Sequence, residues 1–159
     1  MTGIRHFTAS AIVFDQQGQV LLIHHHKLGM WLYPGGHIDP NEDPAQAVVR
    51  EVREETGVAV ELVSAGTPFT HPAVVTHPVP FAILELPVPH DPAVGPHHHI
   101  DLVYVCRAIS RELTPRPGEI RDCRWVPVEE VATYHVPPHL PDLMAAAAAW
   151  VDSGAAVVR

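Results

Sequence analysis

Three glutamates, Glu51, Glu54 and Glu55, are the residues of this chain whose spacing points most directly to chemistry. Each residue of an α-helix advances by roughly 100°, so a helix would place these three carboxylates on one face. Carboxylates crowded on one face repel one another unless a cation lies among them. The spacing therefore predicts a divalent-metal site on a helix. The run 34–36, Pro-Gly-Gly, predicts a turn just before it, where glycine lets the backbone approach a ligand.

The helix that would carry these glutamates has clear signals at both ends. Asp43 is a candidate N-cap, Pro44 would take the first helical position, and Gln46 stands where the partner of a capping box belongs. Gly57 stands where helices commonly end, so the sequence predicts a helix over 44–56. One side of this helix is apolar and should pack on a sheet, which leaves the acidic side at a cleft. The apolar side consists of Ala45, Val48, Val49, Val52 and Thr56.

The rest of the chain predicts mainly strands. Residues 6–14 and 20–24 are strand-like, and the polar segment 15–18 between them indicates a hairpin. Further strands are predicted at 58–65, 79–86, 98–108 and 120–126, loops at 67–80 and 87–97, and helices at 128–133 and 141–151. Strands with helices in the middle and near the end of the chain predict an α/β (α+β) fold in which helices pack on a mixed sheet.

The segment from 36 to 58 has a more specific pattern than the three glutamates alone. Its glycines, its arginine and its acidic residues stand at the distances that define the signature of the Nudix hydrolase superfamily, which this segment resembles at every defined position. Residues 32–36 and 125–127 resemble the segments that flank the signature in that superfamily. The defined positions are Gly36, Glu42, Arg50, Glu51, Val52, Glu54, Glu55, Gly57 and Val58.

The resemblance implies a Nudix-type α/β/α sandwich with a mixed β-sheet, with residues 1–159 as a single domain. It also implies hydrolysis of a nucleoside diphosphate linked to another moiety, assisted by Mg²⁺ or Mn²⁺. Mg²⁺ prefers oxygen ligands and retains waters, and bound metal ions can neutralise a pyrophosphate and activate water.

Individual roles follow from the resemblance, position by position. Glu51, Glu54 and Glu55 would hold metal, and Glu51 is a candidate to activate the water. The backbone carbonyl of Gly35 or Gly36 would add a ligand. Arg50 would orient the glutamates, with Glu42 as its salt-bridge partner. A further carboxylate, Glu119, stands a few residues before Trp125 and would be a distal ligand or an alternative base. The alternative for the three glutamates is a solvated helix face.

Two internal histidine triplets, 24–26 and 97–99, raise the question of a second metal site among the thirteen histidines. Neighbours in a strand alternate faces, so at most two members of each triplet point the same way. A zinc site normally needs three or four converging ligands, and we therefore expect surface or substrate-facing histidines. His24, His25 and His26 follow the second strand, where some triphosphate-hydrolysing relatives of the resembled superfamily carry arginine. We expect them to contact the substrate anion weakly or in a pH-dependent way, with a structural role as the alternative.

Several aromatic side chains are candidates for nucleobase stacking, although core packing is the commoner role of such residues. Tyr33, next to the signature, is the candidate that we expect to contact the substrate. The others are Trp31, Phe69, Phe81 and Tyr104.

Composition limits the partners. A net charge of −8 argues against broad binding of nucleic-acid polymers, although bound cations can invert the local charge for a small nucleotide or nucleotide derivative. No stretch has the roughly 18 apolar residues of a membrane span, and no basic, apolar leader is recognisable. Two cysteines fit a reducing cytoplasm better than a disulfide-bonded protein. A homodimer is possible, since many members of the resembled superfamily dimerise.

Two other functions compete with pyrophosphohydrolysis. A catalytically silent Nudix-fold sensor would bind a nucleotide without cleaving it, but such proteins usually lack one of the signature glutamates, all of which are present. An isoprenoid diphosphate isomerase of related fold would need a catalytic cysteine, and neither Cys106 nor Cys123 stands in such a pattern.

Overall fold

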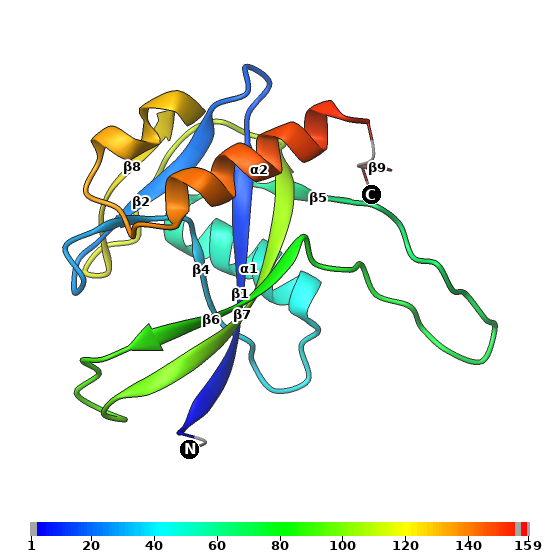
Figure 1. Cartoon of the computed structure of the whole chain (residues 1–159), viewed down its shortest axis with the longest axis horizontal. Coiled ribbons are helices and arrows are strands. Elements are labelled where there is room, and N and C mark those ends of the chain that lie inside the picture. Colours follow the sequence, from blue (N-terminus) through cyan, green and yellow to red (C-terminus); the bar gives the residue numbers. More distant parts are fainter. Residues whose placement is uncertain (1–2, 155–156, 159) are drawn as a thin grey trace.

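A mixed β-sheet between two helical layers organises the chain (Figure 1). The computed structural model describes residues 3–154 and 157–158. The strands are β1 (Arg5–Phe14), β2 (Val20–His25), β3 (Trp31–Leu32), β4 (Gly35–His37), β5 (Val60–Ser64), β6 (Ala82–Val88), β7 (His97–Ala108), β8 (Ile120–Val126) and β9 (Val157–Val158). The helices are α1 (Pro44–Thr56), the 3₁₀ helix η1 (Val128–Thr133) and α2 (Leu140–Asp152).

The two longest strands, β1 and β7, form the parallel centre of the sheet. They pair from Arg5 opposite His98 to Phe14 opposite Arg107. Antiparallel strands complete the sheet on both sides, with β2 and β4 on β1, β5 and β6 on β7, and β8 on β2. This arrangement confirms the predicted sandwich with a mixed sheet.

Side chains of each central strand alternate between two cores. In β1, Ala9, Ala11 and Val13 pack in the core under α1, whereas Ile12 and Phe14 pack in the core under α2 and η1. The alternation is the period-two pattern of a strand buried on both faces. Cys106 and Cys123 are free and buried in the α1 core.

Helix α1 has the bounds predicted from its end signals. Oδ1 of Asp43 accepts a hydrogen bond from the backbone N–H of Gln46 (2.9 Å), and Oε1 of Gln46 accepts one from the N–H of Asp43 (3.0 Å), which completes the capping box. Gly57 ends the helix at a φ of 77°, a left-handed conformation that favours glycine. Local sequence therefore fixes the element that carries the three glutamates.

Three predictions about the strands need correction. The Pro-Gly-Gly run does not form a turn, because Gly35 and Gly36 lie in β4, where they pair with Ser10 and Ala9. The predicted strand at 79–86 is shifted to Ala82–Val88, and the one at 58–65 is shorter. Both bounds follow from antiparallel pairing with β7, because β6 ends at Val88 opposite His97 and β5 begins at Val60 opposite Ala108.

The predicted loop at 67–80 is confirmed, and the connection between β5 and β6 extends away from the sheet (Figure 1). Among the described residues, no helix has the length and apolar character needed to cross a bilayer.

Candidate functional site

Arg50 is the centre of an ion-pair network on the acidic side of α1. Its guanidinium donates to both carboxylate oxygens of Glu42, at 2.7 and 2.9 Å, and to Oε1 of Glu51 at 2.9 Å. It also lies 3.2 Å from Oε2 of Glu54 and donates to the carbonyl of His37 at 3.0 Å. The bidentate contact between Arg50 and Glu42 lowers the pKa of Glu42 and raises that of Arg50. Arg50 therefore relieves part of the repulsion among the glutamates.

Glu55 lies outside that network. Its side chain is buried, at 1% exposure, and Oε1 accepts a hydrogen bond from the backbone N–H of Gly35 at 2.8 Å. Burial raises the pKa of Glu55 to about 8, and the nearby carboxylates of Glu51 and Glu119 add to the shift, which the Gly35 hydrogen bond opposes. The helical pattern predicted an acidic face at a cleft, and the structure instead buries one of its three carboxyl groups beside the apolar side.

Glu51 occupies an intermediate position, with 12% of its side chain exposed. Burial raises its pKa, whereas the hydrogen bond and charge of Arg50 lower it. The neighbouring strand β4 approaches this carboxylate closely, because a Cβ atom at Gly36 would lie 2.5 Å from Oε1 of Glu51. A Cβ atom at Gly35 would collide with Oγ of Ser10. Both glycines are therefore required by close packing rather than by a turn.

The segment before β8 brings a fourth carboxylate to the site. The N–H of Arg116 donates to the carbonyl of Glu55 at 3.0 Å, and its guanidinium lies 3.4 Å from Glu54 and 3.4 Å from Glu119. Glu119 acts electrostatically on Glu51 and Glu55, which raises the pKa of both. The structure thus brings Glu119 to the helix glutamates, as the resemblance implied.

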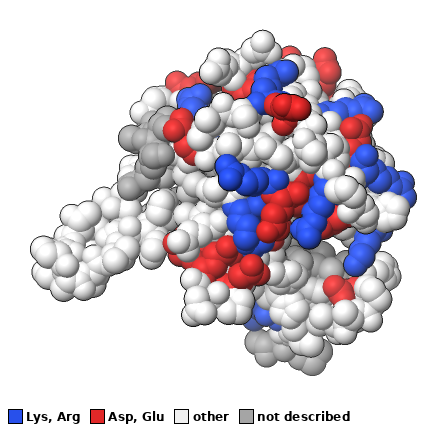
Figure 2. Space-filling model, turned by 180° about the vertical axis from the view of Figure 1, so that it is seen from behind, with Lys and Arg blue, Asp and Glu red and all other residues white. Residues whose placement is uncertain are grey.

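Carboxyl groups outnumber arginines at the site, and this imbalance suits hard cations. Arg50 and Arg116 form ion pairs with five carboxylates, those of Asp39, Glu42, Glu51, Glu54 and Glu119, and Glu55 adds a sixth carboxyl group nearby. Burying like charges without compensation is costly, and an all-oxygen donor set is the one that Mg²⁺ and Mn²⁺ prefer. The residues present therefore fit a divalent cation. Seen from the face opposite α2, acidic side chains gather in the middle of the molecule with basic side chains on either side (Figure 2).

The comparisons with known proteins agree with this geometry. The family model described as NUDIX domain matches residues 4–147. The chain belongs to the NUDIX family. A NUDIX-family hydrolase from Clostridium perfringens superposes on this NUDIX chain with a TM-score of 0.76 at 27% identity, over 93% of this chain and 99% of that one.

Two curated relatives of this NUDIX chain match most of its length. NAD-capped RNA hydrolase NudC of Stutzerimonas stutzeri is 29% identical over 135 residues, which cover 81% of this chain and 41% of NudC. Nucleoside diphosphate-linked moiety X motif 6 of Mus musculus is 33% identical over 132 residues, which cover 79% of this chain and 36% of the mouse protein. The chain therefore spans well under half of the length of either relative.

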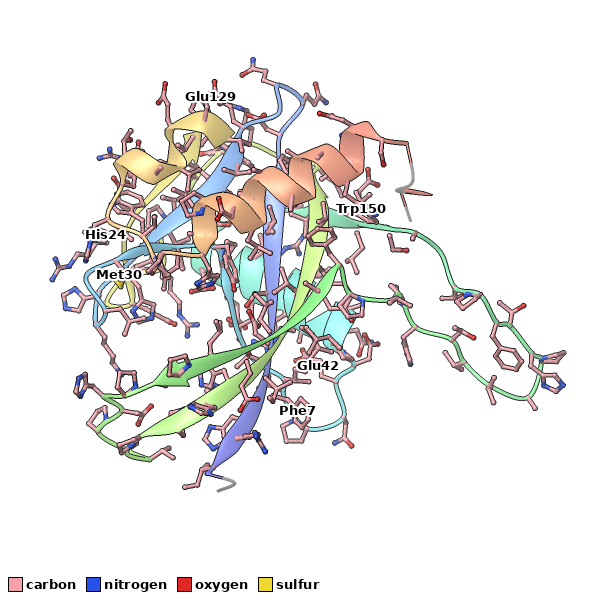
Figure 3. All side chains as sticks on the ribbon, viewed as in Figure 1. Phe7, His24, Met30, Glu42, Glu129 and Trp150 are labelled. Atoms are coloured by element: carbon pink, nitrogen blue, oxygen red, sulfur yellow. The ribbon has the colours of Figure 1, made fainter. Side chains whose placement is uncertain are left out.

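The first histidine triplet of this NUDIX chain lies at the β2–β3 end of the sheet, where His24 is near Met30 and distant from Glu42 (Figure 3). The ring of His24 stacks on Trp31 at a centroid distance of 4.8 Å. The N–H of His26 donates to the carbonyl of Glu119 at 2.8 Å. Burial lowers the pKa of His25, and the charge of Glu119 opposes that shift. The triplet thus borders the site at Glu119 rather than at α1.

Most of the aromatic candidates are placed in the core. Tyr33, expected to contact the substrate, is only 9% exposed and donates its hydroxyl to Oδ2 of the buried Asp101 at 2.9 Å. Trp31 and Tyr104 are also buried, and Phe81 packs against Trp150. A buried ring presents no free face to a base, so the expected Tyr33 contact is not supported. Phe69, 62% exposed on the β5–β6 connection, is the exposed member of the set.

The sequence reasoning missed two charged residues of this network. Arg116 bridges Glu54 and Glu119, and the carboxylate of Asp39 lies 3.4 Å from Nε of Arg50. Arg116 stands three residues before Glu119, and this ion-pair spacing was the one available signal. No pattern marked Asp39, because its contact depends on the path of the loop before α1.

Proposed function

We propose that this NUDIX chain is a pyrophosphohydrolase that uses Mg²⁺ or Mn²⁺ to cleave a nucleoside diphosphate linked to another moiety. The observation that carries the proposal is that Glu51, Glu54, Glu55 and Glu119 are gathered around Arg50 and Arg116. Glu51 and Glu55 are largely buried, whereas the side chains of Glu54 and Glu119 are each 41% exposed. Such an excess of carboxylates, partly open to solvent, is suited to holding cations against a phosphate substrate.

Each residue has a proposed role. Glu51, Glu54, Glu55 and Glu119 would hold the metal, with a backbone carbonyl of Gly35 or Gly36 as a further ligand. When bound, divalent cations neutralise the charge of a pyrophosphate and lower the pKa of water.

Arg50 is proposed to orient the glutamates, because its guanidinium binds both Glu51 and Glu54. Two hydrogen bonds to Glu42 fix the position of the Arg50 guanidinium. Glu51 is proposed to take the proton from the attacking water. Its side chain is 12% exposed, between the buried Glu55 and the exposed Glu54, and Arg50 holds it in place.

The proposed substrate class is a small nucleotide or nucleotide derivative. The relatives of this chain carry names with different nucleotide substrates, including a putative 8-oxo-dGTP diphosphatase of Bacillus subtilis that is 43% identical over 49 residues, 31% of this chain and 33% of that protein. The shared chemistry is a phosphoric anhydride next to a nucleoside. His25 and His26 border Glu119. Together with His24, which precedes them, they are proposed to contact the outer part of the substrate.

The test is a substrate panel assayed with Mg²⁺ and with Mn²⁺. The panel includes nucleoside triphosphates, 8-oxo-dGTP, ADP-ribose, NADH, dinucleoside polyphosphates and nucleotide-sugars, with release of phosphate or nucleoside monophosphate as the readout. Hydrolysis that depends on the metal and falls by roughly 100-fold or more in Glu51→Gln or Glu54→Gln would support the proposal.

Glu129→Gln is the matched control, because Glu129 is an exposed glutamate on η1, in the helical layer opposite α1 (Figure 3). Tight nucleotide binding without turnover by the wild type would instead indicate a silent sensor. Equal activity in Glu54→Gln and Glu129→Gln would contradict the assigned site.

A further inference from the structure

Four histidines from three strands come together on one face of the sheet, and we refer to His6, His37, His97 and His99 as the histidine cluster. His6 on β1 is the register partner of His99 on β7. His37 on β4 is the register partner of Thr8, two residues after His6 on β1. His97 and His99 point the same way because they are two apart in β7. The second triplet thus contributes two members, and single histidines on other strands supply the rest.

The cluster lies on the other face of the sheet from the glutamates. Residues of β4 alternate, so that Gly36 faces Glu51 while His37 faces the opposite side. On β1, His6 has the same parity as Ile12 and Phe14, which pack in the α2 core. The two groups of side chains are therefore separate sites on opposite sides of β4.

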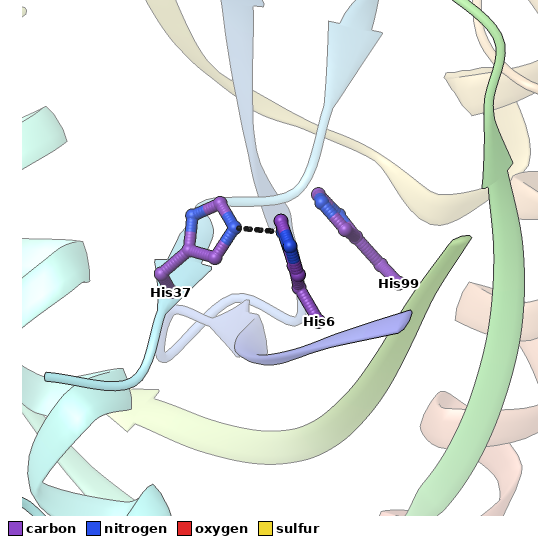
Figure 4. A group of neighbouring side chains, drawn as sticks. All are labelled: His6, His37 and His99. Atoms are coloured by element: carbon purple, nitrogen blue, oxygen red, sulfur yellow. Dashed lines mark hydrogen bonds between the residues drawn. The ribbon is translucent and has the colours of Figure 1, made fainter. Parts of the chain in front are cut away.

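The ring nitrogens of three of these histidines converge (Figure 4). One ligand atom from each of His6, His37 and His99 lies within 4.8 Å of the others. Nε2 of His37 and Nδ1 of His6 are 3.3 Å apart. Two nitrogens bound to one tetrahedral zinc ion at roughly 2.0–2.1 Å would themselves be roughly 3.3–3.4 Å apart, so this pair already has the spacing of two ligands.

His97 holds the ring of His99. Nδ1 of His97 is 2.9 Å from the carbonyl oxygen of Gly95, which can only accept a hydrogen bond, so Nδ1 carries the proton. In the neutral ring, Nε2 of His97 is then an acceptor, and it lies 3.0 Å from Nε2 of His99. Nε2 of His99 is therefore the donor of this hydrogen bond, and Nδ1 of His99 keeps its lone pair. Ligand histidines are commonly oriented by such a second hydrogen bond.

The burial of the four histidines also leaves the group accessible to an ion from one side. His97 is buried, His6 and His99 are half-buried, and His37 is exposed, so that solvent reaches one side of the group. Imidazole nitrogen in the neutral state is a preferred ligand of Zn²⁺.

We propose that His6, His37 and His99 bind one Zn²⁺ ion, with His97 as the residue that positions His99. Three histidine ligands leave a fourth position for water, as in zinc sites that are not fully closed. The ion would tie β1, β4 and β7 together on the face opposite the glutamates. The proposal is independent of pyrophosphohydrolysis, because none of the three ligands is assigned a role in that reaction.

The test is calorimetric titration of the untagged chain with Zn²⁺ in the presence of excess Mg²⁺, which binds imidazole poorly. We expect one equivalent of Zn²⁺ to bind the wild type, and that equivalent to be lost in His6→Gln and in His99→Gln. His98→Gln is the matched control, since His98 is adjacent on β7 but faces away and contacts Glu85. Glu54→Gln should keep the equivalent, which separates the cluster from the acidic site.

His97→Phe tests the positioning role and should weaken Zn²⁺ binding roughly 10- to 100-fold without removing the stoichiometric site. Wild-type stoichiometry and affinity in both His6→Gln and His99→Gln would overturn the proposal, as would a wild type that binds no Zn²⁺. If those variants do not fold, the absorption spectrum of Co²⁺ bound to the wild type is the deciding measurement. A tetrahedral ligand-field spectrum supports the site, and the spectrum of hexaaqua Co²⁺ overturns it.

Discussion

A methyl group at position 36 would lie 2.5 Å from Oε1 of Glu51, closer than atoms can approach without movement. Since Gly36 does not have a positive φ, its substitution tests packing rather than backbone strain. We expect Gly36→Ala to displace the Glu51 carboxylate and to lower kcat by roughly tenfold or more, with a smaller effect on stability. Steady-state kinetics on whichever substrate the panel identifies would measure this. Gly3→Ala is the control, because nothing lies within 4 Å of a Cβ atom there, and equal rates in the two variants would contradict the close approach.

Glu55 couples the stability of the metal-free protein to pH. Its pKa is about 8 in the folded protein against an ordinary value of 4.5, so the unfolded chain releases this proton at lower pH than the folded one. Through this group, stability falls as pH rises from about 4.5 to about 8, and the loss is complete above that range.

Glu55→Gln removes this penalty and can still accept the Gly35 hydrogen bond. In chelator, we expect the variant to be more stable than the wild type at pH values near 8, by on the order of a few kcal/mol at most. The difference should shrink as the pH approaches 4.5. Urea unfolding at a series of pH values measures it. A variant that is less stable than the wild type at every pH would show that ionisation of the buried Glu55 does not destabilise the fold.

At the scale of elements, α1 was predictable because its signals are local. The capping box needs only Asp43 and Gln46, and the C-terminal glycine needs only the backbone conformation at Gly57. The short strand β4 was not predictable, since its identity as a strand comes from pairing with Ser10 and Ala9, far away in sequence. The burial of Glu55 was missed for the same reason, because it depends on how closely β4 approaches α1. The histidine cluster required the parallel pairing of β1 with β7, which no local pattern contains.

The cap of α1 should have a measurable effect on stability. Asp43→Ala removes the acceptor for the Gln46 N–H, and we expect a loss of about 1 kcal/mol in the free energy of unfolding. Asp43→Ser retains an acceptor at the N-cap and should stay within a few tenths of a kcal/mol of the wild type. Denaturant titration followed by circular dichroism gives both values. Equal losses in the two variants would mean that the cap hydrogen bond does not stabilise the helix.

For the whole molecule, the acidic site joins parts that are distant in sequence, namely α1, β4 and the segment before β8. An ion bound there stabilises the folded state by mass action, by about 2.7 kcal/mol when its concentration is 100 times the Kd. We expect Mg²⁺ to raise the thermal midpoint of the wild type and chelator to remove the increase. Glu51→Gln should show little increase, and Glu129→Gln should behave like the wild type. An undiminished response in Glu51→Gln would place the ion elsewhere.

The parallel pairing of β1 with β7 has a consequence for the newly made chain. Arg5 pairs with His98 and Phe14 with Arg107, so one edge of the first strand has no partner until about 100 residues later in synthesis. At roughly 5–20 residues per second, that interval lasts roughly 5–20 seconds. During this interval α1 can already form from its own caps, while the unpaired backbone edge of β1 is open to other chains. We expect this strand to be where a chaperone holds the nascent protein and where aggregation begins if it does not.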